Sequence, residues 1–283
     1  MPCRAFASSL AATIFFAAIS PTSASAAAPA SPAAAAPSYA DLADLAVAAP
    51  LVARVQVRET ARLKPEQAPG LAPGMARVLV KAKTRAVLTG EPQGESIRYL
   101  ADVPLDPKGK LPKLDKREML VFARSVAGRP GELQLVAPDA QVAWDAGLET
   151  RVRAILTELV APGAAPRITG VREALHVPGN LVGEGETQIF LATASGDPVS
   201  LTVLRRPGAA PTWGVAFGEI VDQAARPPRP ETLAWYRLAC FLPAALPAAA
   251  NLASDARARA IAAEDYRLVR RELGACPRTR AQR

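Results

Sequence analysis

The sequence contains a single histidine, three cysteines and few aromatic residues, which make up 5% of its 283 positions. It has no H-E-x-x-H, C-x-x-C or G-x-S-x-G motif and no glycine-rich phosphate loop. Catalytic zinc sites usually use several nitrogen or sulfur ligands, and nucleophilic catalysis usually pairs serine or cysteine with histidine. These absences argue against a metal enzyme, so we expect no metal and no cofactor.

Long apolar runs are also missing after the N-terminal region. Residues 1–26 carry one cation, Arg4, followed by the apolar stretch Leu10–Ile19 and an A-x-A sequence at Ala24–Ala26. This order is that of a cleaved signal peptide, and its apolar core is too short to span a bilayer. We therefore expect a mature chain that starts near Ala27, has no transmembrane segment and is periplasmic or secreted in a bacterium.

The expected mature chain begins with a stretch that has no large apolar side chain to bury in a core. Residues 27–38 are only Ala, Pro and Ser, a composition typical of a disordered tether. The rest of the chain is long enough for one large domain or two small ones. We predict one domain at 39–160 and a second at 167–276, separated by the Pro- and Gly-containing segment Ala161–Pro166.

The clearest strand pattern lies at 116–137, KREMLVFARSVAGRPGELQLVA. Met119–Ala123 is an unbroken apolar run, typical of a strand that is buried on both faces. Gly128–Gly131 has the composition of a turn, and Glu132–Leu135 alternates between polar and apolar residues. This stretch predicts a β-hairpin.

Alternating segments around this hairpin predict further strands. Three precede it, at 51–60, 75–90 and 95–103, with helices expected at 39–49 and 148–160. This order favours a small, curved antiparallel barrel of the OB type.

The second half predicts a β-meander followed by two helices. Its expected strands are 167–177, 187–194, 199–205 and 212–221, and its expected helices are 230–242 and 254–274. The predicted fold class is therefore mainly β with helices: an OB-like barrel, then a β-meander plus two-helix domain.

The barrel region resembles a known family. GESIRYLADVP, at 94–104, followed after a loop by KREMLVFARSVAGRPGELQLV, at 116–136, resembles the second half of netrin-like modules, the fold family of the tissue inhibitors of metalloproteinases. The likeness covers about Leu51–Ala137. Those inhibitors chelate protease zinc through an N-terminal cysteine and carry many disulfides, and this region has no cysteine. The resemblance therefore implies the fold alone.

Two cysteines, Cys240 and Cys276, remain after removal of the signal segment. They flank the two helices expected near the C-terminus. In an oxidising compartment such a pair favours a disulfide, and the alternative is two separately buried thiols.

Positive charge provides the main functional hypothesis. The formal charge is +8, and removal of Arg4 with the signal segment lowers it to +7. Period-two alternation and strand pairing predict a basic face that binds an anionic envelope polymer, a lipid surface or an acidic protein. The alternative is a solvated sheet face. Nucleic acid is disfavoured, because no aromatic residues interleave with the cations. The expected face comprises Arg54, Arg58, Lys81, Lys83, Arg85, Lys108, Lys110, Lys113 and Lys116.

One segment offers a catalytic alternative. Gly183–Thr187, with sequence GEGET, places Glu184 and Glu186 in one loop, and His176 lies in the preceding strand. Together they predict a periplasmic hydrolase, against the simpler interpretation of a solvated turn and a strand-end histidine. We favour an exported, non-enzymatic binding or scaffold protein of the cell envelope, and retain the hydrolase as the alternative.

Overall fold

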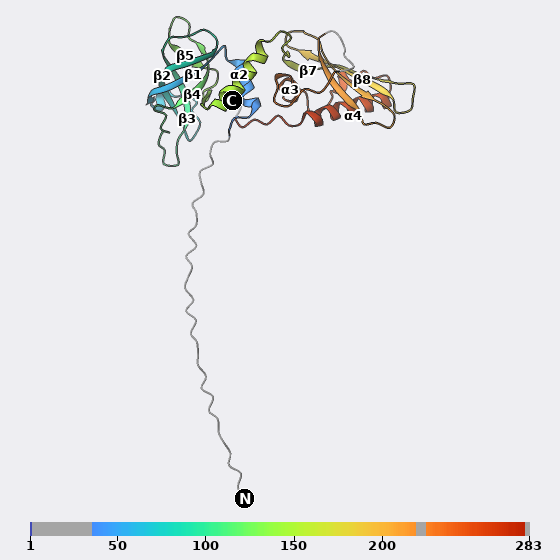
Figure 1. Ribbon diagram of the computed structural model, residues 1–283, viewed down its shortest axis with the longest axis horizontal. Helices are drawn as coiled ribbons and strands as arrows, with labels where there is room; N and C mark the ends of the chain where they lie inside the picture. The colour runs from blue at the N-terminus through green and yellow to red at the C-terminus, as the bar shows by residue number, and fades with distance from the viewer. Residues whose placement is uncertain (2–35, 219–224, 281–283) are drawn as a thin grey trace. The chain divides into compact units, whose positions relative to one another are not determined.

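The computed structural model describes Met1 and residues 36–218 and 225–280 (Figure 1). The predicted signal peptide and most of the predicted tether lie outside the described residues. Residues 36–283 form one compact unit. Within its described part, no helix is long and apolar enough to cross a membrane.

The first half of this unit is a closed barrel. Strand β1 (Leu51–Arg62) pairs with β2 (Met75–Thr89), and β2 pairs with β3 (Ser96–Pro104), both antiparallel. A short parallel pairing joins β3 to β5 (Glu132–Leu135), which is antiparallel to β4 (Glu118–Ser125). Antiparallel pairing of β4 with β1 closes the ring. The OB-like barrel and the central hairpin are therefore confirmed.

Burial explains the strand patterns of the barrel. Met119–Ala123 of β4 is buried throughout, because β1 and β5 flank β4 and helix α1 (Tyr39–Ala48) contacts it. Along β3, Ile97, Tyr99 and Ala101 point into the core, as their alternation predicts. A further strand, β6 (Gln141–Ala143), pairs with β4 and was not predicted, since three residues are too few to establish a period.

Two helices flank the barrel strands in sequence. Helix α1 (Tyr39–Ala48) begins with a capping box in which Ser38 and Asp41 bond each other's backbone N–H groups. Helix α2 (Ala146–Val160) is capped by Asp145, whose carboxylate accepts from the Leu148 N–H group at 2.8 Å. The helices contact each other, and α1 also contacts β4.

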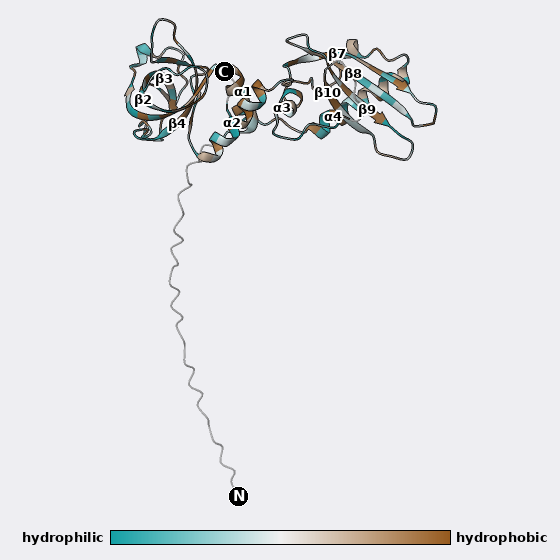
Figure 2. Cartoon of the chain, turned by 45° about the horizontal axis from the view of Figure 1, so that its top comes forward, coloured by the Kyte–Doolittle hydropathy of each residue, from teal (hydrophilic) through white to brown (hydrophobic). Residues whose placement is uncertain are grey.

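The second half contains the predicted β-meander. Strands β7 (Ile168–Pro178), β8 (Gly185–Thr193), β9 (Val199–Arg205) and β10 (Thr212–Phe217) form an antiparallel sheet in the order β10-β9-β8-β7. The last predicted strand extends to residue 221, and residues 219–224 lie outside the described part. Figure 2 shows hydrophilic and hydrophobic residues alternating along these strands. Helix α4 (Ala256–Leu273) packs against β7 and β8.

The third helix is shorter than its sequence suggests. Helix α3 spans Leu233–Ala239, whereas the proline and acid at 230–231 predict an earlier start. Glu231 has a φ of 55°, outside the helical region, and the Thr232 hydroxyl caps the helix by accepting from the Trp235 N–H group. Short 3₁₀ turns occur at Pro65–Gln67 and Ala248–Ala250.

The predicted disulfide joins Cys240 and Cys276, whose Cα atoms lie 5.2 Å apart. Cys240 caps the C-terminal end of α3, and Cys276 follows α4. One cluster of buried apolar side chains includes residues of the barrel, the helices and the meander. The fold thus consists of an OB-like barrel, a meander and helices that share a core.

Candidate functional site

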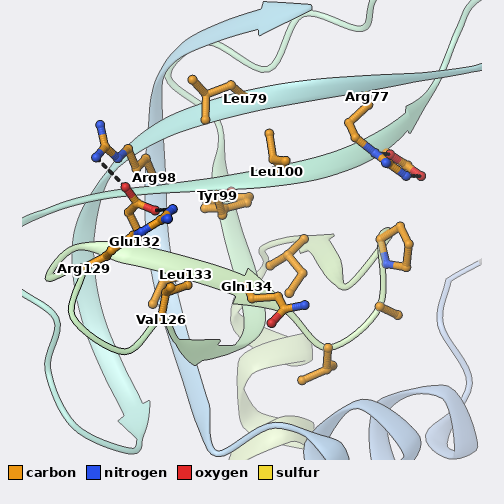
Figure 3. Close-up of a pocket in the computed structure, with 15 residues that line it drawn as sticks. Arg77, Leu79, Arg98, Tyr99, Leu100, Val126, Arg129, Glu132, Leu133 and Gln134 are labelled. Atoms are coloured by element: carbon orange, nitrogen blue, oxygen red, sulfur yellow. Dashed lines mark hydrogen bonds and ion pairs between the residues drawn. The ribbon is translucent and has the colours of Figure 1, made fainter. Parts of the chain in front are cut away.

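A groove of about 820 Å³ lies on the outside of the barrel, over β2, β3 and β5 (Figure 3). It forms where the parallel pairing of β3 with β5 is short, with only Arg98 opposite Glu132 and Tyr99 opposite Leu133. The chain leaves β5 at Leu135 and bonds β3 again where the Asp102 N–H group donates to the Pro138 carbonyl at 2.7 Å. Its apolar lining consists of Leu79, Tyr99, Leu100, Val126, Leu133, Leu135, Val136, Ala137 and Pro138.

Leu100 is an exposed apolar side chain in this lining. Its neighbours Tyr99 and Ala101 are 2% and 1% exposed, whereas Leu100 points outward and is 46% exposed. Leu79 is directly opposite it on β2. These adjacent aliphatic side chains form a small apolar patch on the outer face of the strand pair.

Ion pairs lie at both ends of the groove. At one end, Arg77 donates two hydrogen bonds to the Asp102 carboxylate, at 2.7 and 3.0 Å. The hydrogen bond to Asp102 raises the pKa of the Arg77 guanidinium despite its partial burial. This pair is neutral as a unit and fixes one wall.

The other end has an excess of positive charge. Arg98 and Arg129 both contact the Glu132 carboxylate, at 2.5 and 3.3 Å. The hydrogen bond from Arg98, with a further bond from Arg129, lowers the pKa of Glu132. One carboxylate thus faces two guanidinium groups, which leaves one positive charge for a ligand to match.

Sequence reasoning missed this groove. Each strand was predicted, but the juxtaposition of β3 with β5 is a consequence of barrel closure. One signal was present in the sequence: Leu100 occupies an outward position in the alternating segment 95–103, between Arg98 and Asp102.

Four of the cations expected on a basic face are matched by acids. Arg54 lies 4.7 Å from the centre of the Trp144 ring and pairs with Glu149 at 3.4 Å. Arg54 and Arg85 also share Glu118, each at 3.7 Å. On the same strands, Lys81 pairs with Glu59 at 3.0 Å and Lys83 pairs with Glu95. These strand cations therefore form a locally balanced surface.

The remaining cations of the expected face differ from these four in having no acidic partner in an ion pair within the described residues. Arg58, Lys108, Lys110, Lys113 and Lys116, which we call the cationic loop cluster, are exposed, and no ion pair involves them within the described residues. The Asp106 carboxylate accepts from the backbone N–H groups of Lys108 and Lys110, both at 2.8 Å. Lys116 donates its N–H to the Val57 carbonyl at 3.0 Å, next to Arg58. The loop thus has a defined backbone and unmatched side-chain charge.

The residues of the catalytic alternative are only partly brought together. His176 and Glu184 line one pocket, and Glu184 also lines a neighbouring pocket together with Glu186, which His176 does not line. Glu186 lies apart from His176 because side chains alternate along β8. Thr187 faces His176, so Glu186, the residue before it, points to the other side of the sheet. Thr187 is 0% exposed, so its hydroxyl is inaccessible as a nucleophile.

Comparison with known proteins adds no assignment to these sites. No family model matches the chain, and no curated protein matches it. Among the residues that the structure describes, no group of three or more His, Cys, Asp or Glu side chains has the arrangement of a metal site. The groove, the cationic loop cluster and the His176 pocket are therefore the candidate sites.

Proposed function

We propose that the protein is an exported, non-enzymatic binding or scaffold protein of the bacterial cell envelope, and that it binds a protein partner in the groove of the barrel. The observation that carries this proposal is the apolar floor on the β2–β3 face, formed by the exposed Leu100 and the half-buried Leu79 opposite it. OB folds commonly bind their ligands on this face. A groove of about 820 Å³ is also within the usual size of ligand sites.

The lining favours a particular kind of occupant. Apolar residues form its floor, so an apolar segment of the partner gains free energy by leaving water there. At the end of the groove, Arg98 and Arg129 share one carboxylate and retain one unmatched positive charge. An acidic side chain on the partner would match that charge, since arginine binds carboxylates with paired hydrogen bonds. We therefore propose an apolar segment that ends in an acidic residue.

The chemistry of the lining supports binding over catalysis. The residues that line the groove include no histidine, cysteine, serine or lysine. The hydroxyl of Tyr99 is engaged, because it donates to Gln141 at 3.0 Å, and the carboxylates are held by arginines. No side chain of the lining is therefore placed as a nucleophile or as its general base.

Site-specific photocrosslinking in cells tests this function. A photoreactive amino acid at Gln134, an exposed position in the groove, is expected to crosslink one envelope protein. Leu100→Asp should reduce that crosslink at least about tenfold, because it buries an unpaired carboxylate against the apolar segment.

The matched control uses a leucine outside the groove. Leu252 is 54% exposed and belongs to the other half of the chain, so Leu252→Asp should leave the crosslink from position 134 unchanged. Equal loss with both variants, or a crosslink that Leu100→Asp does not reduce, would contradict binding in the groove.

A further inference from the structure

His176 belongs to a buried chain of polar groups beneath a second pocket. The pocket has a volume of about 590 Å³ and lies between the β7–β8 loop and the N-terminal end of α4. His176 is 6% exposed and lines it. Behind the imidazole, the chain continues through Thr187 of β8 and Asp265 of α4 to Arg205 of β9.

The hydrogen bonds fix where the imidazole carries its proton. The hydroxyl of Thr187 donates its only hydrogen to the Asp265 carboxylate, at 2.5 Å. The 2.8 Å contact between that hydroxyl and His176 Nδ1 therefore requires Nδ1 to be the donor. In the neutral ring, Nε2 is then an unprotonated acceptor. Asp265 is itself held by Arg205, whose Nε atom donates to it at 2.8 Å.

Within the described residues, Nε2 has no hydrogen-bond partner. The ring edge that carries it packs on Gly185, where a Cβ atom would lie 2.9 Å from Nε2 and 2.7 Å from Cε1. Nε2 is not among the fully buried side-chain atoms that lack a partner in the described residues, so a molecule in the pocket can reach it. This acceptor is therefore open to a donor that binds there.

The charges around the pocket favour a cationic donor. Its lining contains Glu184, Asp255, Arg205 and Arg257. The Arg205 charge is already matched twice, by Asp265 at 2.6 Å and by Glu264 at 3.3 Å. The carboxylates of Glu184 and Asp255 then remain beside the guanidinium group of Arg257. Each also accepts backbone N–H groups, Glu184 from Asn180 and Leu181 and Asp255 from Ala258, and the charge of Arg259 acts on Asp255. Their remaining lone pairs can still accept from a cationic donor.

The remaining walls are aliphatic. Leu181 and Val182, in the β7–β8 loop, are 63% and 94% exposed, and Ile261 of α4 also lines the pocket. Exposed aliphatic side chains beside carboxylates suit a ligand with a short carbon chain and a charged end.

We propose that this pocket is a binding site for a small aliphatic amine, whose ammonium group donates a hydrogen bond to Nε2 of His176 and lies in the field of Glu184 and Asp255. The site is independent of the barrel groove. Thr187 and Asp265 act as positioning residues, because they hold the imidazole in the tautomer that leaves Nε2 free to accept.

The environment of the imidazole keeps it in the accepting form. Burial lowers the pKa of His176, and the nearby Arg205 lowers it further, while Asp265 and Asp255 oppose these effects. The net direction is downward, so the ring is neutral at pH 7. An ammonium donor requires this neutral ring.

The single histidine makes the test direct, because histidine-labelled protein gives the NMR signals of one imidazole. Butylamine is the probe, with butyrate as the anionic and 1-butanol as the neutral molecule of similar size. Butylamine should shift the imidazole signals saturably, whereas butyrate should not. A long-range proton–nitrogen spectrum should show Nδ1 protonated. Saturation with butylamine should lower the His176 pKa by about half a unit or more, which is a roughly threefold preference for the neutral ring.

Two matched variants locate the bound amine. Glu184→Gln removes one charge of the pocket and should weaken butylamine binding several-fold. Glu186→Gln, two residues away and lining the neighbouring pocket, should leave it unchanged. An Nε2-protonated ring, equal shifts with butyrate, no saturable shift with butylamine, or equal weakening by the two variants would each overturn the proposal.

Discussion

At the scale of single residues, Asp41 connects the first helix to the last described segment of the chain. Its carboxylate accepts from the Ser38 N–H at 2.9 Å, from the Thr279 hydroxyl at 2.6 Å and from the Arg280 N–H at 3.1 Å. Burial by itself raises the pKa of Asp41, but these hydrogen bonds together outweigh it and lower the pKa to about 2. The ionised form is therefore the one that the fold stabilises.

This depressed pKa predicts a pH-dependent contribution to stability. Because the folded pKa is about 2 and the ordinary pKa of an aspartate is 3.8, Asp41 stabilises the fold at neutral pH by about 2 kcal/mol. The contribution is present above about pH 4 and is lost as the pH falls towards 2. Asp41→Asn should therefore cost about 2 kcal/mol at pH 7 and little at pH 2, as measured by urea unfolding at both pH values.

The control for this measurement is Asp115→Asn. Asp115 is exposed, and its replacement should change the free energy of unfolding by less than about 0.5 kcal/mol at either pH. A cost of Asp41→Asn that is the same at pH 7 and pH 2 would show that its carboxylate charge does not stabilise the fold.

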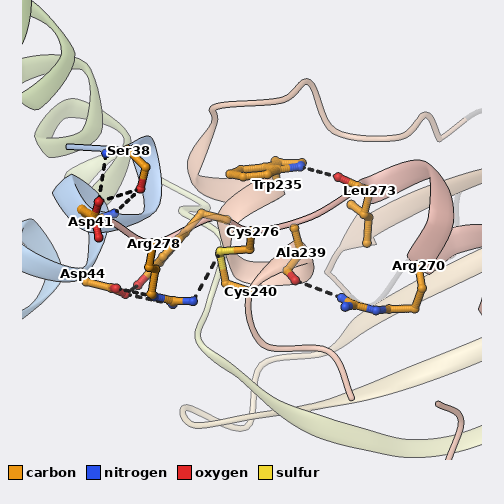
Figure 4. The surroundings of a disulfide bond; sticks show 11 residues. Ser38, Asp41, Asp44, Trp235, Ala239, Cys240, Arg270, Leu273, Cys276 and Arg278 are labelled. Carbon is orange, nitrogen blue, oxygen red and sulfur yellow. Dashed lines mark hydrogen bonds and ion pairs between the residues drawn. A yellow bond between two sulfur atoms is a disulfide. The ribbon is translucent and has the colours of Figure 1, made fainter. Parts of the chain in front are cut away.

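At the scale of elements, the disulfide attaches the C-terminal segment to the helices (Figure 4). Two residues after Cys276, Arg278 donates to the Asp44 carboxylate at 2.6 and 3.2 Å. The Tyr236 hydroxyl of α3 donates to the same carboxylate at 2.5 Å. The covalent bond and these hydrogen bonds together hold α1, α3 and the segment after α4.

Removal of the disulfide should be strongly destabilising. The cysteines are 36 residues apart in sequence, and closing a loop of this length stabilises a fold by about 3–4 kcal/mol in the chain-entropy model. Cys240→Ala combined with Cys276→Ala should lower the free energy of urea unfolding by that amount. Reduction of the unaltered protein should give a similar loss, and a double variant as stable as the oxidised protein would refute this role.

The cationic loop cluster and the strand cations allow a comparison within one barrel. The ammonium groups of Lys81 and Lys83 are paired with acids, whereas those of Lys108, Lys110 and Lys113 are not, within the described part of the chain. Unmatched, exposed charges contribute more to long-range attraction of an anionic surface than charges in ion pairs do.

We predict that the unmatched charges dominate any binding to anionic lipid. Replacing Lys108, Lys110 and Lys113 with Gln should abolish salt-sensitive retention on vesicles that contain anionic lipid. Replacing both members of the two strand pairs with Gln, Lys81 with Glu59 and Lys83 with Glu95, should reduce it only slightly, because each pair is close to neutral as a unit. Cosedimentation at low and high salt measures both. Stronger loss in the strand variant, or no retention of the unaltered protein at low salt, would count against the prediction.

At the scale of the whole molecule, the sequence of the first 26 residues predicts export and cleavage near Ala26. The disulfide is consistent with an oxidising compartment, where such bonds persist. Intact mass of the protein recovered from the periplasm should correspond to a chain that begins near Ala27. A protein that retains Met1 and remains in the cytoplasm would contradict the prediction.

The fold was largely readable from the sequence because its signals are local. Alternation along 51–62 and 75–89 and the apolar run Met119–Ala123 reflect side chains that face one core, and turns rich in glycine separate them. The predicted start of α3 at Pro230 was wrong, because Thr232 caps a helix that begins at Leu233 and the backbone at Glu231, with a φ of 55°, is not helical. Strand β6 has only three residues, which are too few to show an alternation of polar and apolar side chains.

The sequence by itself determined the strand and helix order, the paired cysteines and the excess of positive charge. The tertiary structure decided what those charges do, because Glu118 is distant in sequence from Arg54 and Arg85 and reaches them only when β4 pairs with β1. It also decided the groove, which exists because barrel closure places β5 beside β3. The same holds for the polar chain behind His176, whose members come from separate strands and a helix. Period and composition act between neighbours in sequence, whereas sites form between residues that only folding brings together.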